Sequence, residues 1–164
     1  MARVLIVTGA RKGIGRAMAE HFLARGDVVA GVSRKPADLD AEGYEHFQLD
    51  VSDEPGVARL VSQLKKRHGR IDGLVNNAGR ASMNHLLLTP SSTGRKLFET
   101  NFFGSFHFLR ETAKAMRRQE RGRIVNFTSV AVPLALEGEA MYAASKAAVE
   151  TLTKVASREL APFN

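Results

Sequence analysis

Two side chains near the end of the sequence have types and a spacing suited to acid–base chemistry. Tyr142 and Lys146 are four residues apart, which places them one turn apart on the same face of a helix. A phenol is a weak base near neutral pH, and a neighbouring ammonium group favours its phenolate form. Tyr142 can therefore donate a proton to a carbonyl oxygen as hydride arrives, or remove one from an alcohol. Taken alone, this spacing also fits an ordinary surface pair.

Two further polar residues could take part in such a reaction. Ser129, thirteen residues before Tyr142, can hydrogen-bond the same substrate oxygen and stabilise the negative charge that develops on it. Asn101 lies in a helical stretch with an apolar face, where a buried amide is costly unless polar partners satisfy it. Considered by itself, Asn101 is better explained as a satisfied amide in the core.

A glycine-rich segment, T-G-A-R-K-G-I-G at residues 8–15, follows the first apolar run. Glycines let the backbone turn tightly and approach a pyrophosphate, and the helix that follows offers free N–H groups to an anion. Its position between a strand and an amphipathic helix fits a dinucleotide site, with a plain glycine turn as the alternative. The residues expected to contact the dinucleotide here are Gly9, Arg11, Lys12, Gly13, Ile14 and Gly15.

The end of the second expected strand bears on the choice of cofactor. An acid at this point would bind the 2′-hydroxyl of the adenosine ribose and repel a 2′-phosphate. This chain has Ser33 there, followed by Arg34, whose guanidinium matches the geometry of a phosphate. Lys12 adds a second positive charge from the glycine-rich segment. We therefore expect NADP(H), and the alternative is that Arg34 and Lys12 are ordinary surface charges.

Strand and helix patterns alternate along the chain. Continuous apolar, β-branched runs predict buried strands, and apolar residues spaced three or four apart predict helices. The expected strands cover residues 3–7, 28–32, 47–51, 71–75 and 124–128, and the expected helices cover 14–25, 52–68, 93–118 and 142–160. This alternation predicts an α/β fold with a parallel sheet in a single domain, residues 1–164, with helices on both faces.

Together these features resemble the short-chain dehydrogenase/reductase family over essentially all 164 residues. The resemblance implies a Rossmann-type, doubly wound parallel sheet of order 3-2-1-4-5. It also implies an oxidoreductase that moves hydride between NADP(H) and a carbonyl or alcohol carbon of a small substrate. The matching motifs are T-G-x-x-x-G-x-G at 8–15, Asp50-Val51, Asn76-Asn77-Ala78-Gly79, Asn101, Ser129 and Tyr142-x-x-x-Lys146.

The resemblance also implies a role for each motif. Tyr142 would be the acid–base residue, Ser129 would orient the substrate, and Lys146 would also hold the nicotinamide ribose. Asn101 would position a water in a proton relay through a local irregularity of its helix. No metal is expected. The remaining cofactor contacts implied are Asp50 and Val51 at the adenine, and Asn77, Ala78 and Gly79 after the fourth strand.

Five of the nine phenylalanines fall in one stretch of the long helix, at positions 98, 102, 103, 106 and 108. They cover too much of its circumference for a single buried stripe. Family members pack this helix and the last one against a second subunit, so the resemblance implies a homodimer or homotetramer through helices 93–118 and 142–160. A helix wholly buried within one chain is the alternative.

The composition narrows the functional classes. The chain has 24 Lys and Arg against 17 Asp and Glu, a net charge of +7, but these charges are scattered and not interleaved with aromatics, which argues against nucleic-acid binding. No apolar run approaches the roughly 20 residues of a membrane span. The absence of cysteine excludes disulfides and thiolate metal sites and fits a reducing compartment, so we expect a cytoplasmic protein.

Family members normally continue past residue 160 with further strands and a segment that covers the substrate. We therefore expect a fold without its final strands, in which residues 124–127 form an exposed edge that promotes association. Three functions stay open: a reductase whose distal part is absent here, an idle nucleotide-binding or interaction chain, and a basic nucleic-acid-binding domain. The intact set of Asn101, Ser129, Tyr142 and Lys146 favours the first.

Overall fold

Five parallel strands form one sheet in the order β3-β2-β1-β4-β5 in the computed structural model, which describes residues 2–163. The chain builds outward from β1 to β3, then crosses over to β4 and continues to β5. This confirms the predicted doubly wound sheet and its strand order. The strands are β1 (Val4–Thr8), β2 (Val28–Ser33), β3 (Tyr44–Gln48), β4 (Gly73–Asn76) and β5 (Arg123–Asn126).

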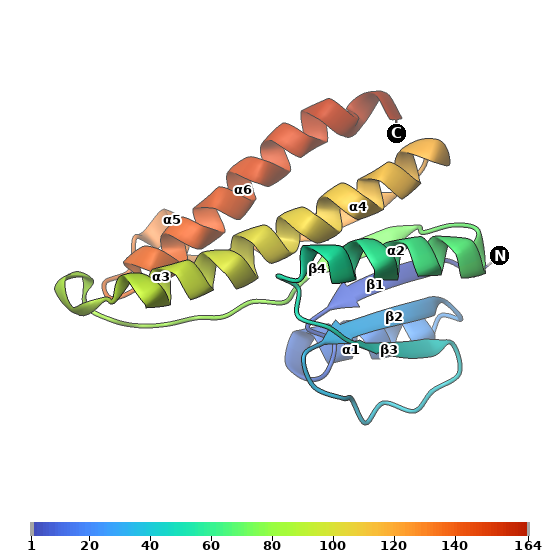
Figure 1. The fold of residues 1–164 in the computed structure, drawn as a ribbon, viewed down its shortest axis with the longest axis horizontal. Coiled ribbons are helices and arrows are strands. Elements are labelled where there is room, and N and C mark those ends of the chain that lie inside the picture. Colours follow the sequence, from blue (N-terminus) through green and yellow to red (C-terminus); the bar gives the residue numbers. More distant parts are fainter. Residues whose placement is uncertain (1, 164) are drawn as a thin grey trace.

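Helices cover the two faces of this sheet (Figure 1). On one face α1 packs Met18 and Phe22 against Val7 of β1, and on the other α2 and α4 pack against the neighbouring Ile6. Adjacent strand residues point to opposite faces, so the sheet carries two separate cores. The helices are α1 (Gly13–Leu23), α2 (Glu54–His68), η1 (Leu86–Leu88), α3 (Ser91–Phe98), η2 (Glu99–Phe103), α4 (Gly104–Arg118), α5 (Ala131–Leu134), α6 (Ala140–Leu160) and η3 (Ala161–Phe163).

Strand boundaries differ from the sequence prediction, and the differences at β3 and β5 move predicted site residues out of their strands. β3 begins at Tyr44, because Tyr44 to Gln48 pair in register with Val29 to Ser33 of β2. Asp50 and Val51 consequently lie in the turn after β3, where the Asp50 carboxylate accepts a 3.0 Å hydrogen bond from the Ser52 amide. β5 ends at Asn126, so Ser129 also lies beyond its strand.

The predicted long helix is present but divided into three parts. α3 and α4 are joined by η2, one π-helical turn that contains Asn101. Its phenylalanines are not all buried: Phe108 is fully buried, but Phe103 is 39% exposed. Phe102 and Phe106 stack at 6.4 Å, and the Arg110 guanidinium lies 5.2 Å from the Phe106 ring. The alternative of a wholly buried helix is therefore wrong.

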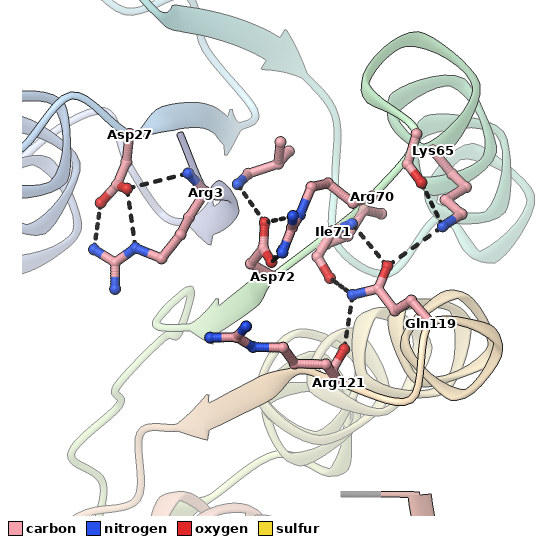
Figure 2. Close-up of polar contacts among 10 residues, drawn as sticks. Arg3, Asp27, Lys65, Arg70, Ile71, Asp72, Gln119 and Arg121 are labelled. Atoms are coloured by element: carbon pink, nitrogen blue, oxygen red, sulfur yellow. Dashed lines mark hydrogen bonds and ion pairs between the residues drawn. The ribbon is translucent and has the colours of Figure 1, made fainter. Parts of the chain in front are cut away.

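Polar side chains form hydrogen bonds and ion pairs at the end of the sheet where β1 and β4 begin (Figure 2). The carboxylate of Asp72 accepts a 2.8 Å hydrogen bond from the Val4 amide and 2.9 Å bonds from Arg70 Nε. The amide of Gln119, just after α4, donates to the Ile71 carbonyl at 2.5 Å and accepts from the Ile71 amide at 3.2 Å. These contacts anchor β1 and the start of β4 opposite the end that carries the glycine-rich loop.

No helix within residues 2–163 combines the length and the apolar character that crossing a membrane requires.

Candidate active site

The glycine-rich loop is held against the loop that follows β4. Thr8 Oγ1 accepts 3.0 Å hydrogen bonds from the amides of both Asn77 and Ala78, and Asn77 Nδ2 donates to the Thr8 carbonyl at 2.9 Å. A Cβ atom on Gly9, whose φ is +72°, would lie 2.7 Å from Asn77 Nδ2. A side chain at Gly9 would therefore force the two loops apart. Thr8 was not among the predicted site residues, although its place in the T-G pair was a signal.

The start of α1 is open to an anionic ligand. Lys12 occupies the position before the helix and no side chain caps the helix start; the first turn contains no acidic residue. The first amide groups of a helix lack intrahelical acceptors and carry a partial positive charge. Together with the Arg11 and Lys12 side chains, they make this loop suited to a phosphate group.

A groove of about 920 Å³ runs along the carboxyl ends of the strands beside this loop. Its volume is within the usual range for small-molecule sites. Gly15 is absent from its lining, because this residue is buried against the Gly9 carbonyl and Asn77. Gly15 allows the two loops to approach each other closely, and its contact with the dinucleotide stays a prediction. The predicted contacts that line the groove are Gly9, Arg11, Lys12, Gly13, Ile14, Ser33, Arg34, Asp50, Val51, Asn77, Ala78 and Gly79.

Gly79 lines this groove and lies next to two predicted catalytic side chains. A Cβ atom on Gly79 would lie 3.4 Å from Asn101 Oδ1 and 3.5 Å from Lys146 Nζ. The ammonium of Lys146 donates to the Phe127 carbonyl at 2.8 Å, and the residue is 5% exposed. Burial lowers the pKa of Lys146 below its ordinary value of 10.5.

Asn101 is fully buried and its amide is satisfied by the protein. Its Oδ1 accepts from the Arg80 amide at 2.8 Å, and its Nδ2 donates to the Arg80 carbonyl and to Ser145 Oγ, both at 2.9 Å. The Ser145 hydroxyl donates in turn to the Tyr142 carbonyl at 2.7 Å. The π-helical turn is thereby joined to the first turns of α6. Ser145 was not predicted, although it lies inside the Tyr142–Lys146 motif.

Ser129 and Tyr142 lie on the segments next to this cluster. Ser129 Oγ accepts a 3.2 Å hydrogen bond from the Ala131 amide at the start of α5, and Tyr142 is half-buried in the first turn of α6. The segments 80–90 and 130–139 meet here, since the Asn84 amide donates to the Gly138 carbonyl at 2.8 Å.

Residues 3–164 match the family model described as short chain dehydrogenase. The chain belongs to the short-chain dehydrogenase family. This family comprises oxidoreductases that use a nicotinamide cofactor, act on small molecules and are typically oligomeric.

Individual members of the short-chain dehydrogenase family are also similar to this chain. The NAD-dependent glycerol dehydrogenase of Listeria innocua is 34% identical over 168 residues, which are 99% of this chain and 66% of that protein. A short-chain dehydrogenase from Streptomyces avermitilis superposes with a TM-score of 0.95 at 37% identity, over 100% of this chain and 63% of that one. ElxO with NADP bound gives a TM-score of 0.94 at 32% identity, over 99% and 70% of the two chains. The chain thus spans about two thirds of the length of these relatives.

Proposed function

We propose that the chain carries the cofactor-binding and catalytic part of an NADP(H)-dependent oxidoreductase that acts on a carbonyl or alcohol carbon. The proposal rests on the approach of Asn101 Oδ1 and Lys146 Nζ to Gly79, a residue that lines the groove. Two features support a dinucleotide in this groove: the backbone at Gly9 leaves no room for a side chain, and the uncapped start of α1 faces the groove with basic residues. When bound, the nicotinamide supplies or accepts the hydride.

Four side chains have separate roles in the proposed reaction. In the proposed reduction Tyr142 donates a proton to the substrate oxygen, and Ser129 hydrogen-bonds the same oxygen. The buried Lys146 ammonium favours the phenolate form of Tyr142 and holds the nicotinamide ribose. Asn101 keeps the π-helical turn joined to α6 and, in this proposal, serves a proton relay to solvent.

The preference for NADP(H) rests on the residues of this chain. Ser33 ends β2 and Arg34 follows it; both line the groove, and Lys12 lines it from the glycine-rich loop. Relatives differ in this respect, since one is named as NAD-dependent and another was solved with NADP bound. A hydrogen bond to a charged group contributes about 1.5–3 kcal/mol, so NADPH should bind about ten- to a hundredfold more tightly than NADH.

Fluorescence titration of the purified protein with NADPH and NADH tests this preference. Arg34→Ala should weaken NADPH binding and leave NADH binding nearly unchanged. Arg25→Ala removes an exposed arginine that does not line the groove, and is the matched control. Equal or tighter binding of NADH by the wild type would contradict the proposed cofactor.

The proposal includes assembly into a homodimer or homotetramer through helices 91–118 and 140–160. Exposed apolar side chains on both helices support it: Phe103 is 39% exposed and Val155 is 48% exposed. Light scattering on Phe103→Glu should show a smaller particle than the wild type, and an unchanged mass would argue against this interface.

A further inference from the structure

Three side chains form a hydrogen-bonded chain behind the turn that follows β2. The Tyr44 hydroxyl lies 2.8 Å from His46 Nδ1, and His46 Nε2 lies 3.0 Å from both Ser33 Oγ and the Lys35 carbonyl oxygen. Ser33 Oγ lies 2.6 Å from the same carbonyl oxygen. The function proposed above gives no role to Tyr44 or His46.

The hydrogen-bond acceptors in this cluster indicate which side-chain atoms carry the protons. The Lys35 carbonyl can only accept, so both Ser33 Oγ and His46 Nε2 donate to it. When the imidazole is neutral and carries its proton on Nε2, Nδ1 is an acceptor and the Tyr44 hydroxyl donates to it. Tyr44 therefore selects the tautomer of His46 that can donate toward the turn.

The sheet is built to accommodate this chain. Tyr44 and His46 are two residues apart on β3 and so point to the same face, and His46 pairs in register with Gly31 of β2. The Tyr44 ring occupies the space that a side chain at Gly31 would take, since a Cβ there would lie 2.6 Å from Tyr44 Cζ. Gly31 thus allows the Tyr44 hydroxyl to reach His46.

Side chains of β3 bind the main-chain carbonyls of Arg34 and Lys35, the two basic residues that the turn presents to the groove. His46 binds the Lys35 carbonyl, and Gln48 Nε2 donates to the Arg34 carbonyl at 3.1 Å. The side chains of Arg34 and Lys35 are exposed and line the groove. A turn that is held before binding loses less conformational freedom when a phosphate orders its side chains.

We infer that His46, oriented by Tyr44, is a positioning residue that determines specificity for the ribose 2′-phosphate. It holds the turn at residues 33–35 so that Ser33 and Arg34 meet the phosphate. It also remains a donor to the Lys35 carbonyl when the Ser33 hydroxyl rotates toward a phosphate oxygen, so this carbonyl keeps a partner. The inference rests on the proposed NADP(H) site and adds the element that shapes it.

The test compares two probes that lack nicotinamide and differ only in the 2′-phosphate: adenosine 2′,5′-bisphosphate and 5′-AMP. Calorimetric titration of His46→Phe should show about three- to tenfold weaker binding of the bisphosphate, the size expected for one hydrogen bond and some turn ordering, with 5′-AMP within about twofold. His46→Gln keeps a side-chain N–H donor and should retain most of the preference. Tyr44→Phe keeps the ring over Gly31 and should give an intermediate loss.

The outcomes separate this inference from the function on which it rests. A wild type that binds both probes equally would contradict the NADP(H) site itself. A wild type that prefers the bisphosphate, with the same preference in His46→Phe, would overturn the role of His46 alone. Equal losses in His46→Gln and His46→Phe would also overturn it, because the donor would then be irrelevant. His21→Phe, at an exposed histidine, is the matched control, and thermal unfolding verifies that each variant is folded. If His46→Phe is unfolded, an unchanged preference of Tyr44→Phe for the bisphosphate overturns the inference.

Discussion

The ammonium group of Lys146 donates a 2.8 Å hydrogen bond to the main-chain carbonyl of Phe127, which joins α6 to the residue after β5. Among residues 2–163 no carboxylate forms an ion pair with this ammonium group, and burial alone lowers its pKa below 10.5. A charge in this position is costly to the folded state. In the proposed function this charge favours the phenolate form of Tyr142.

Lys146→Met should therefore change both activity and the pH dependence of stability. We expect turnover to fall on the order of 10² or more, because the group that stabilises charge near the substrate is removed. The lowered pKa means that the unfolded chain binds the proton more tightly. The wild-type free energy of unfolding, measured relative to the variant, should rise with pH from the folded-state pKa to 10.5. Urea unfolding from pH 7 to 10.5 measures this difference, and a pH-independent difference would contradict it.

Tyr142→Phe should abolish turnover and leave cofactor binding nearly unchanged. The phenyl ring keeps the packing of a half-buried side chain and loses only the hydroxyl. General acid catalysis supplies about 10²–10⁴ in rate, so the loss should be at least in that range. Steady-state reduction of carbonyl compounds, together with NADPH titration, measures both properties. A variant that kept a tenth of the wild-type rate would show that another residue is the acid.

Gly15→Ala should weaken NADPH binding although Gly15 does not line the groove. A Cβ at this position would lie 2.5 Å from Asn77 Nδ2 and press against the Gly9 carbonyl, so the two loops would have to separate. Overpacking of this kind costs about 1–3 kcal/mol. Gly26→Ala is the control, because its added methyl group meets no atom within 4 Å and its φ of +78° brings only local strain. NADPH titration of both variants measures the difference, and thermal unfolding verifies that they are folded. Equal NADPH binding by the two variants would refute the prediction.

Asp72→Ala should destabilise the end of the sheet where β1 and β4 begin, which Figure 2 shows. Burial raises the pKa of Asp72, but hydrogen bonds from Arg70 and the Val4 amide outweigh it and hold the pKa below 3.8. Leaving the Val4 amide without its acceptor should lower the free energy of unfolding by about 1–3 kcal/mol at pH 7. Because the folded-state pKa is lowered, this difference should be complete above about pH 4 and disappear as pH falls through that pKa.

Chemical unfolding of Asp72→Ala between pH 2 and 7 measures this loss. Asp38→Ala is the control, because the Asp38 side chain is 84% exposed and its ion pair with Arg16 should contribute little. A loss for Asp72→Ala that matched the control would mean that the buried carboxylate does not anchor β1.

Strand β5 should make the 164-residue chain self-associate. Among residues 2–163 it pairs only with β4, and its Val125 is 48% exposed. An unpaired edge with apolar side chains is a template for association, and a charge on such a strand opposes it. Light scattering should therefore show a larger mass for the wild type than for Val125→Lys. A wild-type monomer that reduces carbonyl compounds would contradict the prediction.

Local patterns in the sequence were sufficient to predict much of this fold. The apolar spacing of Val57, Leu60, Val61 and Leu64 predicted α2, and each of these residues is buried. The glycine-rich segment was placed correctly between β1 and α1, because the preceding apolar run and the helix periodicity are both contained within a few residues. Strand order followed from the family resemblance and could not be derived from spacing.

Contacts between distant residues decided what the sequence pattern left open. The chain alone determined that Asn101, Ser129, Tyr142 and Lys146 are present in the family order. Only the tertiary structure showed that Asn101 hydrogen-bonds Ser145, 44 residues away. It also showed that Gly15 packs against the Gly9 carbonyl and that His46 lies within hydrogen-bond distance of Ser33. The physical reason is that each of these relationships depends on how β2, β3, η2 and α6 pack, and no periodicity within one segment encodes its neighbours in space.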